Sequence, residues 1–143
     1  MPSASANGLR LLSAVLGIFL ISMGFGKLDW AADSSLLENE LRNWWGPAPA
    51  ISKLYIDWFA MPLHPILARL VLLGELTTGL ALVAGYRLRM AALAALFMIL
   101  NFHFAMGLLF SSEYLTNGYA LPVVGGLVAL VVGARGLPYS LDR

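Results

Sequence analysis

Six side chains of this sequence have types and positions that could serve chemistry inside a largely apolar chain. They are Lys27, Trp58, Arg69, Glu75, Asn101 and His103. Glu75 is the most informative, because it lies ten residues from both Pro65 and Gly85, near the centre of a long apolar run. An ionisable side chain at the middle of a bilayer costs ~2.5–3.5 kcal/mol unless it is paired or faces a polar cavity. Other parts of the chain must therefore provide Glu75 with a partner.

The spacing of these groups along two apolar runs predicts a polar shaft. Counting ~1.5 Å per residue from the outer ends of the two helices places Glu75 and Asn101 at a similar depth of about 15 Å. His103 lies one turn closer to the outer surface, and Arg69 lies about 6 Å deep. The proton-transfer groups are then predicted to be Glu75 and His103, and the substrate-binding groups Lys27, Arg69, Asn101 and Trp58.

A purely structural role for Glu75 is an equal alternative at this stage. A protonated Glu75 that is hydrogen-bonded to Asn101 would satisfy both side chains without burying a charge. The other possible partners are His103, or Lys27 if its side chain turns inward rather than extending to the lipid headgroups. The sequence leaves these possibilities open.

The histidines and the absence of cysteine limit the possible metal chemistry. With no cysteine in the chain, iron–sulfur clusters and c-type haem attachment are excluded. His64 and His103 differ in predicted depth by ~10 Å, so they are poorly placed to bind one haem iron from opposite faces. No metal site is therefore predicted, and a quinone is the cofactor that stays compatible with the sequence.

The composition identifies the protein as a membrane protein. Of 143 residues, 59% are hydrophobic and only 12% are charged, which is too little polar surface to coat a soluble globule. The formal net charge is +1, and no basic cluster of the kind that binds nucleic acid is present. The lipid bilayer and other membrane subunits are the expected partners.

The elements that must position these side chains are four apolar runs. They predict an all-α, integral membrane four-helix bundle that forms a single domain over residues 1–143, with spanning helices at 9–26, 65–85, 90–110 and 117–134. Ser13, Gly17 and Gly24 are small residues on the first helix that allow close approach of a neighbour. Gly46-Pro47 ends the first of two amphipathic pieces within residues 28–61, and Pro62 and Pro65 bound the second spanning helix.

The segment 28–61 holds all four tryptophans and is predicted to be a short helical lid at the membrane surface. Ser35 and Glu38 are spaced as a capping box that would begin the first lid helix. In the second, apolar residues from Ile51 to Phe59 follow helical spacing, with Lys53 and Asp57 on another face. The alternative is a loop that merely carries these aromatic residues.

The distribution of arginine and lysine predicts the orientation. Five basic residues fall at one end of the predicted bundle: Arg10, Arg87, Arg89, Arg135 and Arg143. The basic residues at the other end are outnumbered by acidic ones. Because basic residues favour the cytoplasmic side, we expect both termini in the cytoplasm, the lid outside, and a location in the inner (cytoplasmic) membrane.

Four local motifs make the chain resemble the DoxX-like family of small four-helix membrane proteins. They are Leu9-Arg10, Gly24-Phe25-Gly26-Lys27, Gly46-Pro47-Ala48-Pro49, and Gly74-Glu75 followed by Gly79 to Gly85 with Arg87 and Arg89. The family includes the small membrane subunit of thiosulfate:quinone oxidoreductase. The resemblance implies that Lys27 and Glu75 are the functional pair.

Three functions are compatible with these observations. The first is a membrane subunit of a redox or quinone-linked system that contributes a quinone or lipid headgroup site. The second is an accessory subunit of a larger respiratory, photosynthetic or biosynthetic complex with no chemistry of its own. The third, a carrier or lipid-binding protein that uses the shaft as a path, ranks last because the four short helices contain no inverted repeat. Whether the chain is itself an enzyme stays open.

Overall fold

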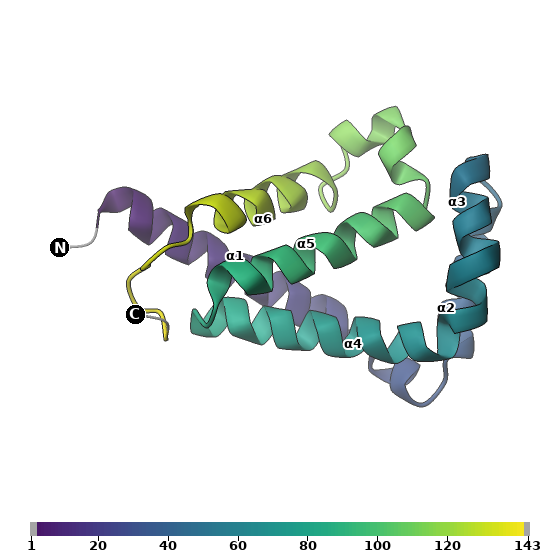
Figure 1. Cartoon of the computed structure of the whole chain (residues 1–143), viewed down its shortest axis with the longest axis horizontal. Coiled ribbons are helices and arrows are strands. Elements are labelled where there is room, and N and C mark those ends of the chain that lie inside the picture. Colours follow the sequence, from purple (N-terminus) through teal and green to yellow (C-terminus); the bar gives the residue numbers. More distant parts are fainter. Residues whose placement is uncertain (1–2, 142–143) are drawn as a thin grey trace.

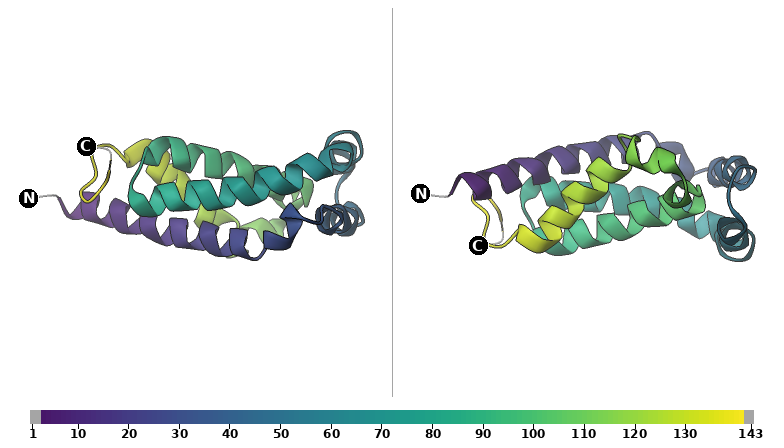
Figure 2. Two further views of the ribbon diagram at one scale, coloured as in Figure 1. Left: turned by 90° about the horizontal axis from the view of Figure 1, so that it is seen from below. Right: turned by 90° about the horizontal axis from the view of Figure 1, so that it is seen from above.

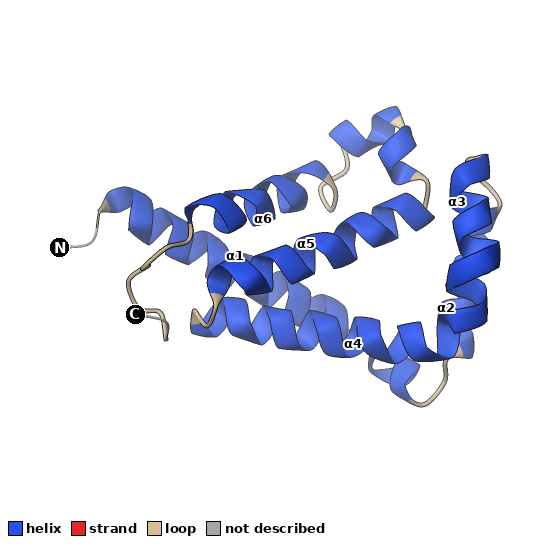
Figure 3. Cartoon of the chain, viewed as in Figure 1, coloured by secondary structure: helices blue, strands red, loops and turns tan. Residues whose placement is uncertain are grey.

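Helices, turns and loops make up all of the computed structural model over the residues that it describes, 3–141 (Figure 3). The predicted all-helical class is therefore confirmed. Four apolar helices form a bundle: α1 (Ala4–Phe25), α4 (Met61–Ala84), α5 (Leu88–Ala105) and α6 (Leu121–Gly133). Helix α1 packs against α4 and α6, and α5 packs against the same two helices (Figure 1).

Three helical segments of the described chain are long and apolar enough to cross a membrane. They are α1, the continuous segment Ala50–Ala84 that contains α4, and α5. Helix α6 is also apolar but has only 13 residues, a length of about 20 Å. The four-helix membrane bundle is thus observed with a shorter fourth helix than the predicted range 117–134.

Small residues set the distance between α1 and α4. A Cβ atom on Gly17 would lie 2.6 Å from the backbone oxygen of Gly79, and one on Gly79 would lie 2.8 Å from the oxygen of Gly17. Ser13, Gly17 and Gly24 are all buried, which confirms the prediction that they form the contact face of the first helix. The two backbones therefore meet directly, as in other membrane helix pairs with glycine at the interface.

The lid crosses one end of the bundle, opposite the two termini (Figures 1 and 2). It consists of η1 (Leu28–Ala31), α2 (Ser35–Trp45) and α3 (Ala50–Tyr55), and α2 and α3 are both seen end-on in Figure 2. Ser52 donates a hydrogen bond of 2.6 Å to the Phe104 carbonyl of α5. The predicted helical lid over residues 28–61 is therefore present and is tied to the bundle.

The start of the second spanning helix differs from the prediction at Pro65. A π-helical turn, η2 (Ile56–Ala60), joins α3 to α4, so the helix continues through both Pro62 and Pro65. A proline removes one backbone donor inside a helix. The carbonyl of Met61, which would pair with residue 65, instead lies 2.8 Å from Nδ1 of His64. The first turns of α4 consequently pack against the lid rather than beginning the bundle.

Other predicted boundaries are also corrected. Ser35 does not cap α2, because it is the first residue of the helix and Ser34 is the N-cap residue. The Ser35 amide hydrogen is donated to the side chain of Asp33 at 2.9 Å. Helix α5 ends at Ala105 rather than at residue 110, because the chain turns at Gly107, whose φ of 74° is in the left-handed region. A Cβ there would lie 2.5 Å from Cδ of Pro49 in the lid. This contact requires glycine and stops the helix.

Two short 3-10 helices, η3 (Leu108–Phe110) and η4 (Ser112–Leu115), follow α5. Helix α6 then begins at Leu121, later than predicted, with Pro122 in its first turn, where the missing backbone N–H has no helical partner to lose. This connection places residues 108–119 beside the lid end of the bundle (Figure 1).

Candidate functional site

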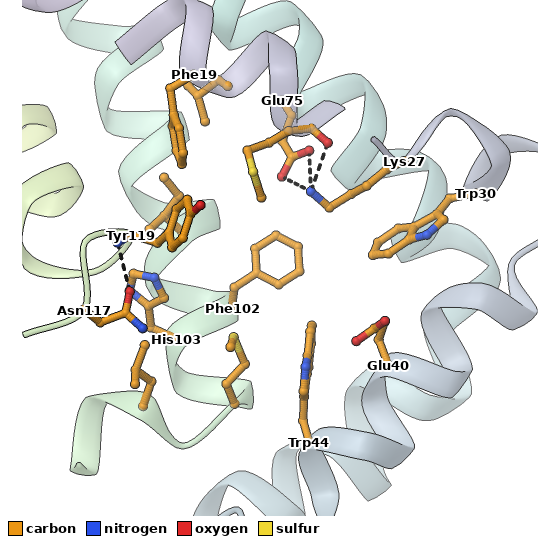
Figure 4. A pocket seen from close by; sticks show the side chains of 15 residues that line it. Phe19, Lys27, Trp30, Glu40, Trp44, Glu75, Phe102, His103, Asn117 and Tyr119 are labelled. Carbon is orange, nitrogen blue, oxygen red and sulfur yellow. Dashed lines mark hydrogen bonds and ion pairs between the residues drawn. The ribbon is translucent and has the colours of Figure 1, made fainter. Parts of the chain in front are cut away.

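A cavity of about 510 Å³ lies between the lid end of the bundle and the lid (Figure 4). Its walls come from α1, η1, α2, α4, α5 and the connection after α5. Three of the six predicted chemical side chains line it: Lys27, Glu75 and His103. A volume of this size is within the range of roughly 300–1,000 Å³ found for small-molecule sites.

Lys27 and Glu75 form a bidentate ion pair on one side of this cavity. The Lys27 ammonium donates to both carboxylate oxygens of Glu75, at 2.8 and 2.9 Å, and to the carbonyl of Met23 at 3.2 Å. The two side chains are only 13% and 6% exposed. Glu75 therefore has the internal partner that its position demands, and among the predicted partners it is Lys27 that pairs with it.

The local sequence explains how the two charges meet. Helix α1 ends at Phe25, and Lys27 immediately precedes η1. Gly24 packs against α4 so closely that a Cβ on it would lie 2.8 Å from Cδ2 of Leu76 and 3.4 Å from Cβ of Glu75. Close approach at Gly24 thus brings the end of α1 beside Glu75.

Aromatic side chains form one part of the remaining wall, beside the polar Glu40 and Asn117 and several aliphatic side chains. Five of them line the cavity: Phe19, Trp30, Trp44, Phe102 and Tyr119. Trp44 of the lid meets Phe102 edge to face at a centroid distance of 6.0 Å, and Phe19 stacks on Tyr119 at the same distance. The Lys27 ammonium lies 5.7 Å from the Trp30 ring centroid, a distance at which a cation–π attraction operates.

His103 lies in another part of the cavity wall, near Asn117 and Tyr119 (Figure 4). The residue is 6% exposed, and its Nδ1 atom has no hydrogen-bond partner within residues 3–141. The ring meets Tyr114 edge to face at 5.5 Å. Partial burial raises the pKa of the Tyr114 phenol, so this neighbour stays neutral at physiological pH.

Three predicted substrate-binding residues do not line the cavity, and the single polar shaft is therefore wrong. Asn101 accepts a hydrogen bond of 2.7 Å from the hydroxyl of Tyr55 and so joins α5 to the lid. Arg69 is exposed and donates to the carbonyl of Pro65 in its own helix. Trp58 is 82% exposed on the π-helical turn.

The aromatic wall was not predicted from the sequence. Trp30 and Trp44 were expected at the membrane surface, which is a property of the residue type and contains no information about a cavity. Phe102 is adjacent in sequence to His103, so its place on α5 beside a predicted site residue was the one sequence signal for this part of the wall. Tyr119 lies in a connection without helical periodicity, so only the folded chain could place it.

The fold and the site define a class: a small helical membrane protein with a buried ion pair in an aromatic cavity at one end of its bundle. The DoxX family model matches residues 8–108, which cover α1 to α5 and the lid. The chain belongs to the DoxX family, as its motifs indicated. No curated protein and no solved structure gives a significant match.

Proposed function

We propose that this DoxX protein is a small membrane subunit of a redox system and that its cavity holds the headgroup of a quinone. The observation that supports this most directly is the buried Lys27–Glu75 ion pair, in a wall that also holds five aromatic side chains. A quinone ring is flat and apolar on its faces and polar at two opposite oxygens. Such a ligand needs aromatic surfaces for the ring and a few well-placed polar groups for the oxygens.

Each member of the ion pair has a distinct part in this proposal. The Lys27 ammonium can hydrogen-bond to a quinone oxygen with the hydrogen that it otherwise donates to the Met23 carbonyl. Glu75 is the proton carrier, since a carboxylate close to the reacting oxygen acts as a general acid or base over one hydrogen-bond distance. The bilayer accommodates the isoprenoid tail. We further propose that the termini are cytoplasmic and that a partner subunit supplies or receives the electrons.

The experiment is quinone extraction from protein purified out of its own membrane in mild detergent. We expect near-stoichiometric quinone in the wild-type extract and little in the double variant Lys27→Met/Glu75→Leu, which removes both charges and preserves side-chain volume. Arg69→Met is the matched control, because Arg69 lies outside the cavity, and it should retain the quinone. Equal quinone in all three proteins, or none in the wild type, would contradict the proposal.

A second candidate is an accessory subunit in which the same ion pair is only a clamp. The observation that favours it is that Lys27 and Glu75 join the end of α1 to α4. In that case the double variant should bind its partner subunits normally and leave the activity of the complex unchanged. Activity of the assembled complex therefore separates the two candidates, whereas assembly alone does not.

A further inference from the structure

We propose that the end of the bundle opposite the lid binds the headgroup phosphate of an anionic phospholipid, in a recess lined by Arg87, Arg89 and Arg135. The recess shares no lining residue with the cavity, so this inference does not depend on the proposed quinone site. It assigns a specific lipid ligand to the other end of the protein.

An open recess of about 480 Å³ lies between the start of α5 and the end of α6. The start of α5 follows the end of α4 that lies opposite the lid (Figure 1). Three arginines and a few small or apolar residues line the recess. Because the planar guanidinium of arginine matches the geometry of phosphate oxygens, this lining suits a phosphate-bearing anion.

Arg89 is positioned for such a ligand by a bond to the neighbouring helix. Its Nε donates a hydrogen bond of 2.7 Å to the carbonyl of Val131, near the end of α6. Within residues 3–141 this is the hydrogen bond that the side chain makes, so the four N–H groups on its two Nη atoms are available to a ligand. A guanidinium that is already held in place loses less conformational freedom on binding.

The positive charge at this end is not balanced by nearby acidic residues. Residues 76–112 and 114–141 contain no Asp or Glu, and Asp142 lies outside the described part of the chain. Within that described part, neither Arg89 nor Arg135 has an ion pair. Like charges close together repel one another, and an anion between them replaces this repulsion with attraction.

The backbone of Arg87 gives an independent reason to assign a role to its side chain. Its φ of 43° is in the left-handed region, which glycine adopts readily and a residue with a long side chain does not. Glycine would be the less strained residue at this position. Strained backbone occurs preferentially at binding and active sites, so an arginine retained here indicates that the guanidinium is needed.

The surroundings favour a phospholipid over a free anion or an acidic protein segment. The recess is at the start of α5, which is long and apolar enough to cross a membrane. Along α5 from the recess, Met90, Leu93 and Phe97 expose 62%, 48% and 77% of their surfaces. Their spacing of three and four residues places them on one helix face, where acyl chains can lie while the phosphate occupies the recess. Basic pockets between spanning helices bind anionic headgroups in this way.

The test is lipid titration of the purified chain in mild detergent, with bound lipids counted by native mass spectrometry. The probes are short-chain phosphatidylglycerol, which is anionic, and short-chain phosphatidylcholine, which has the same phosphodiester but no net charge. We expect the wild type to bind phosphatidylglycerol at least about tenfold more tightly than phosphatidylcholine. Inorganic phosphate at an equal concentration should not displace it. Equal affinity for the two lipids, or displacement by phosphate, would overturn the proposal.

Variants assign the effect to the recess. Arg89→Gln/Arg135→Gln should lower phosphatidylglycerol affinity about 25-fold, or about fivefold for each arginine. Lys53→Gln/Arg69→Gln is the matched control, since it removes the same charge from residues outside the recess, and it should keep the wild-type affinity. An equal loss in the two double variants would show a general effect of net charge and overturn the proposal.

Two single variants guard against a loss that merely reflects misfolding. Arg135→Gln changes an exposed side chain and should lower phosphatidylglycerol affinity about fivefold with an unchanged unfolding temperature. Arg87→Gly relieves the left-handed backbone and should still lower the affinity about fivefold, which a purely structural role for Arg87 would not explain. Full affinity in both single variants would overturn the proposal.

Discussion

Lys27 and Glu75 illustrate how a single pair of side chains determines what the surrounding protein must do. Glu75 alone would be a costly residue in an apolar helix. The hydrogen bonds of 2.8 and 2.9 Å from Lys27 offset the cost of burying the Glu75 charge. In a buried pair of this kind the attraction does little more than compensate for the lost hydration of the two charges.

Substitutions at Glu75 separate its structural and chemical roles. Glu75→Leu leaves the Lys27 ammonium buried without its partner, so we expect a loss in the free energy of unfolding on the order of 3 kcal/mol. Glu75→Gln keeps a hydrogen-bond acceptor but cannot carry a proton, so the loss should be smaller. Thermal unfolding in detergent measures both variants, and Lys27→Met/Glu75→Leu should recover most of the stability. If the double variant stays as far below the wild type in stability as Glu75→Leu does, the pair is a stabilising clamp after all.

Turnover of the assembled membrane complex gives the second readout for the same residue. If Glu75 carries the proton, Glu75→Gln should assemble normally but lower turnover by at least about 100-fold, the usual contribution of a positioned acid or base. Unchanged turnover in an assembled Gln complex would remove the proton-transfer role. The quinone-binding role would then be judged by the extraction experiment alone.

The α1–α4 contact is the element that holds the ion pair together. Because the Gly17 and Gly79 backbones touch, an added methyl group must push the helices apart. We expect Gly79→Ala to lower the free energy of unfolding by about 1–3 kcal/mol. Gly125→Ala is the control, since a Cβ there meets nothing within 4 Å, and it should be neutral or slightly stabilising. Thermal unfolding of the two variants under identical conditions provides the comparison, and equal destabilisation would contradict direct backbone contact.

The lid is a second element whose attachment can be tested. Tyr55→Phe removes the hydroxyl that donates to Asn101 and should cost about 1 kcal/mol of local stability. Amide hydrogen exchange in residues 35–60 should accelerate about fivefold, because this bond joins the lid to α5. Tyr139→Phe, at the opposite end of the molecule, should leave lid exchange unchanged. Unaltered exchange in the Tyr55 variant would show that Ser52 and the apolar contacts hold the lid alone.

The whole molecule is electrically asymmetric along its long axis. Arg10 donates to the Val83 carbonyl near the end of α4 that lies opposite the lid, and Arg87, Arg89 and Arg135 lie together at that same end. The lid end has the basic residues Lys27, Arg42 and Lys53, which are outnumbered there by acidic residues. At that lid end, Ile51, Leu54 and Trp58 expose 55%, 58% and 82% of their surfaces. Residues of this kind favour the lipid headgroup region. The asymmetry supports a single orientation with the lid at the outer membrane surface.

This orientation is testable because the chain has no cysteine of its own. An impermeant thiol reagent added outside intact cells should label Ser112→Cys in the connection at the lid end. Asn7→Cys, exposed near the N-terminus, should be labelled only after the membrane is opened. The reverse pattern would place the lid and the cavity on the cytoplasmic side.

Apolar runs and breaker residues were enough to predict an all-helical membrane bundle with a lid, since hydrophobic length and interfacial tryptophans are local properties of the chain. The motifs around Lys27 and Glu75 also indicated the family. The pairing of Lys27 with Glu75, the aromatic wall, and the removal of Arg69, Asn101 and Trp58 from the site depended on the tertiary structure. The π-helical turn at Ile56–Ala60 and the glycine contacts of α1 with α4 set the relative rotation and height of the helices. Counting depth along single helices cannot predict the relative rotation or height of the helices, because both arise from packing between segments that are distant in sequence.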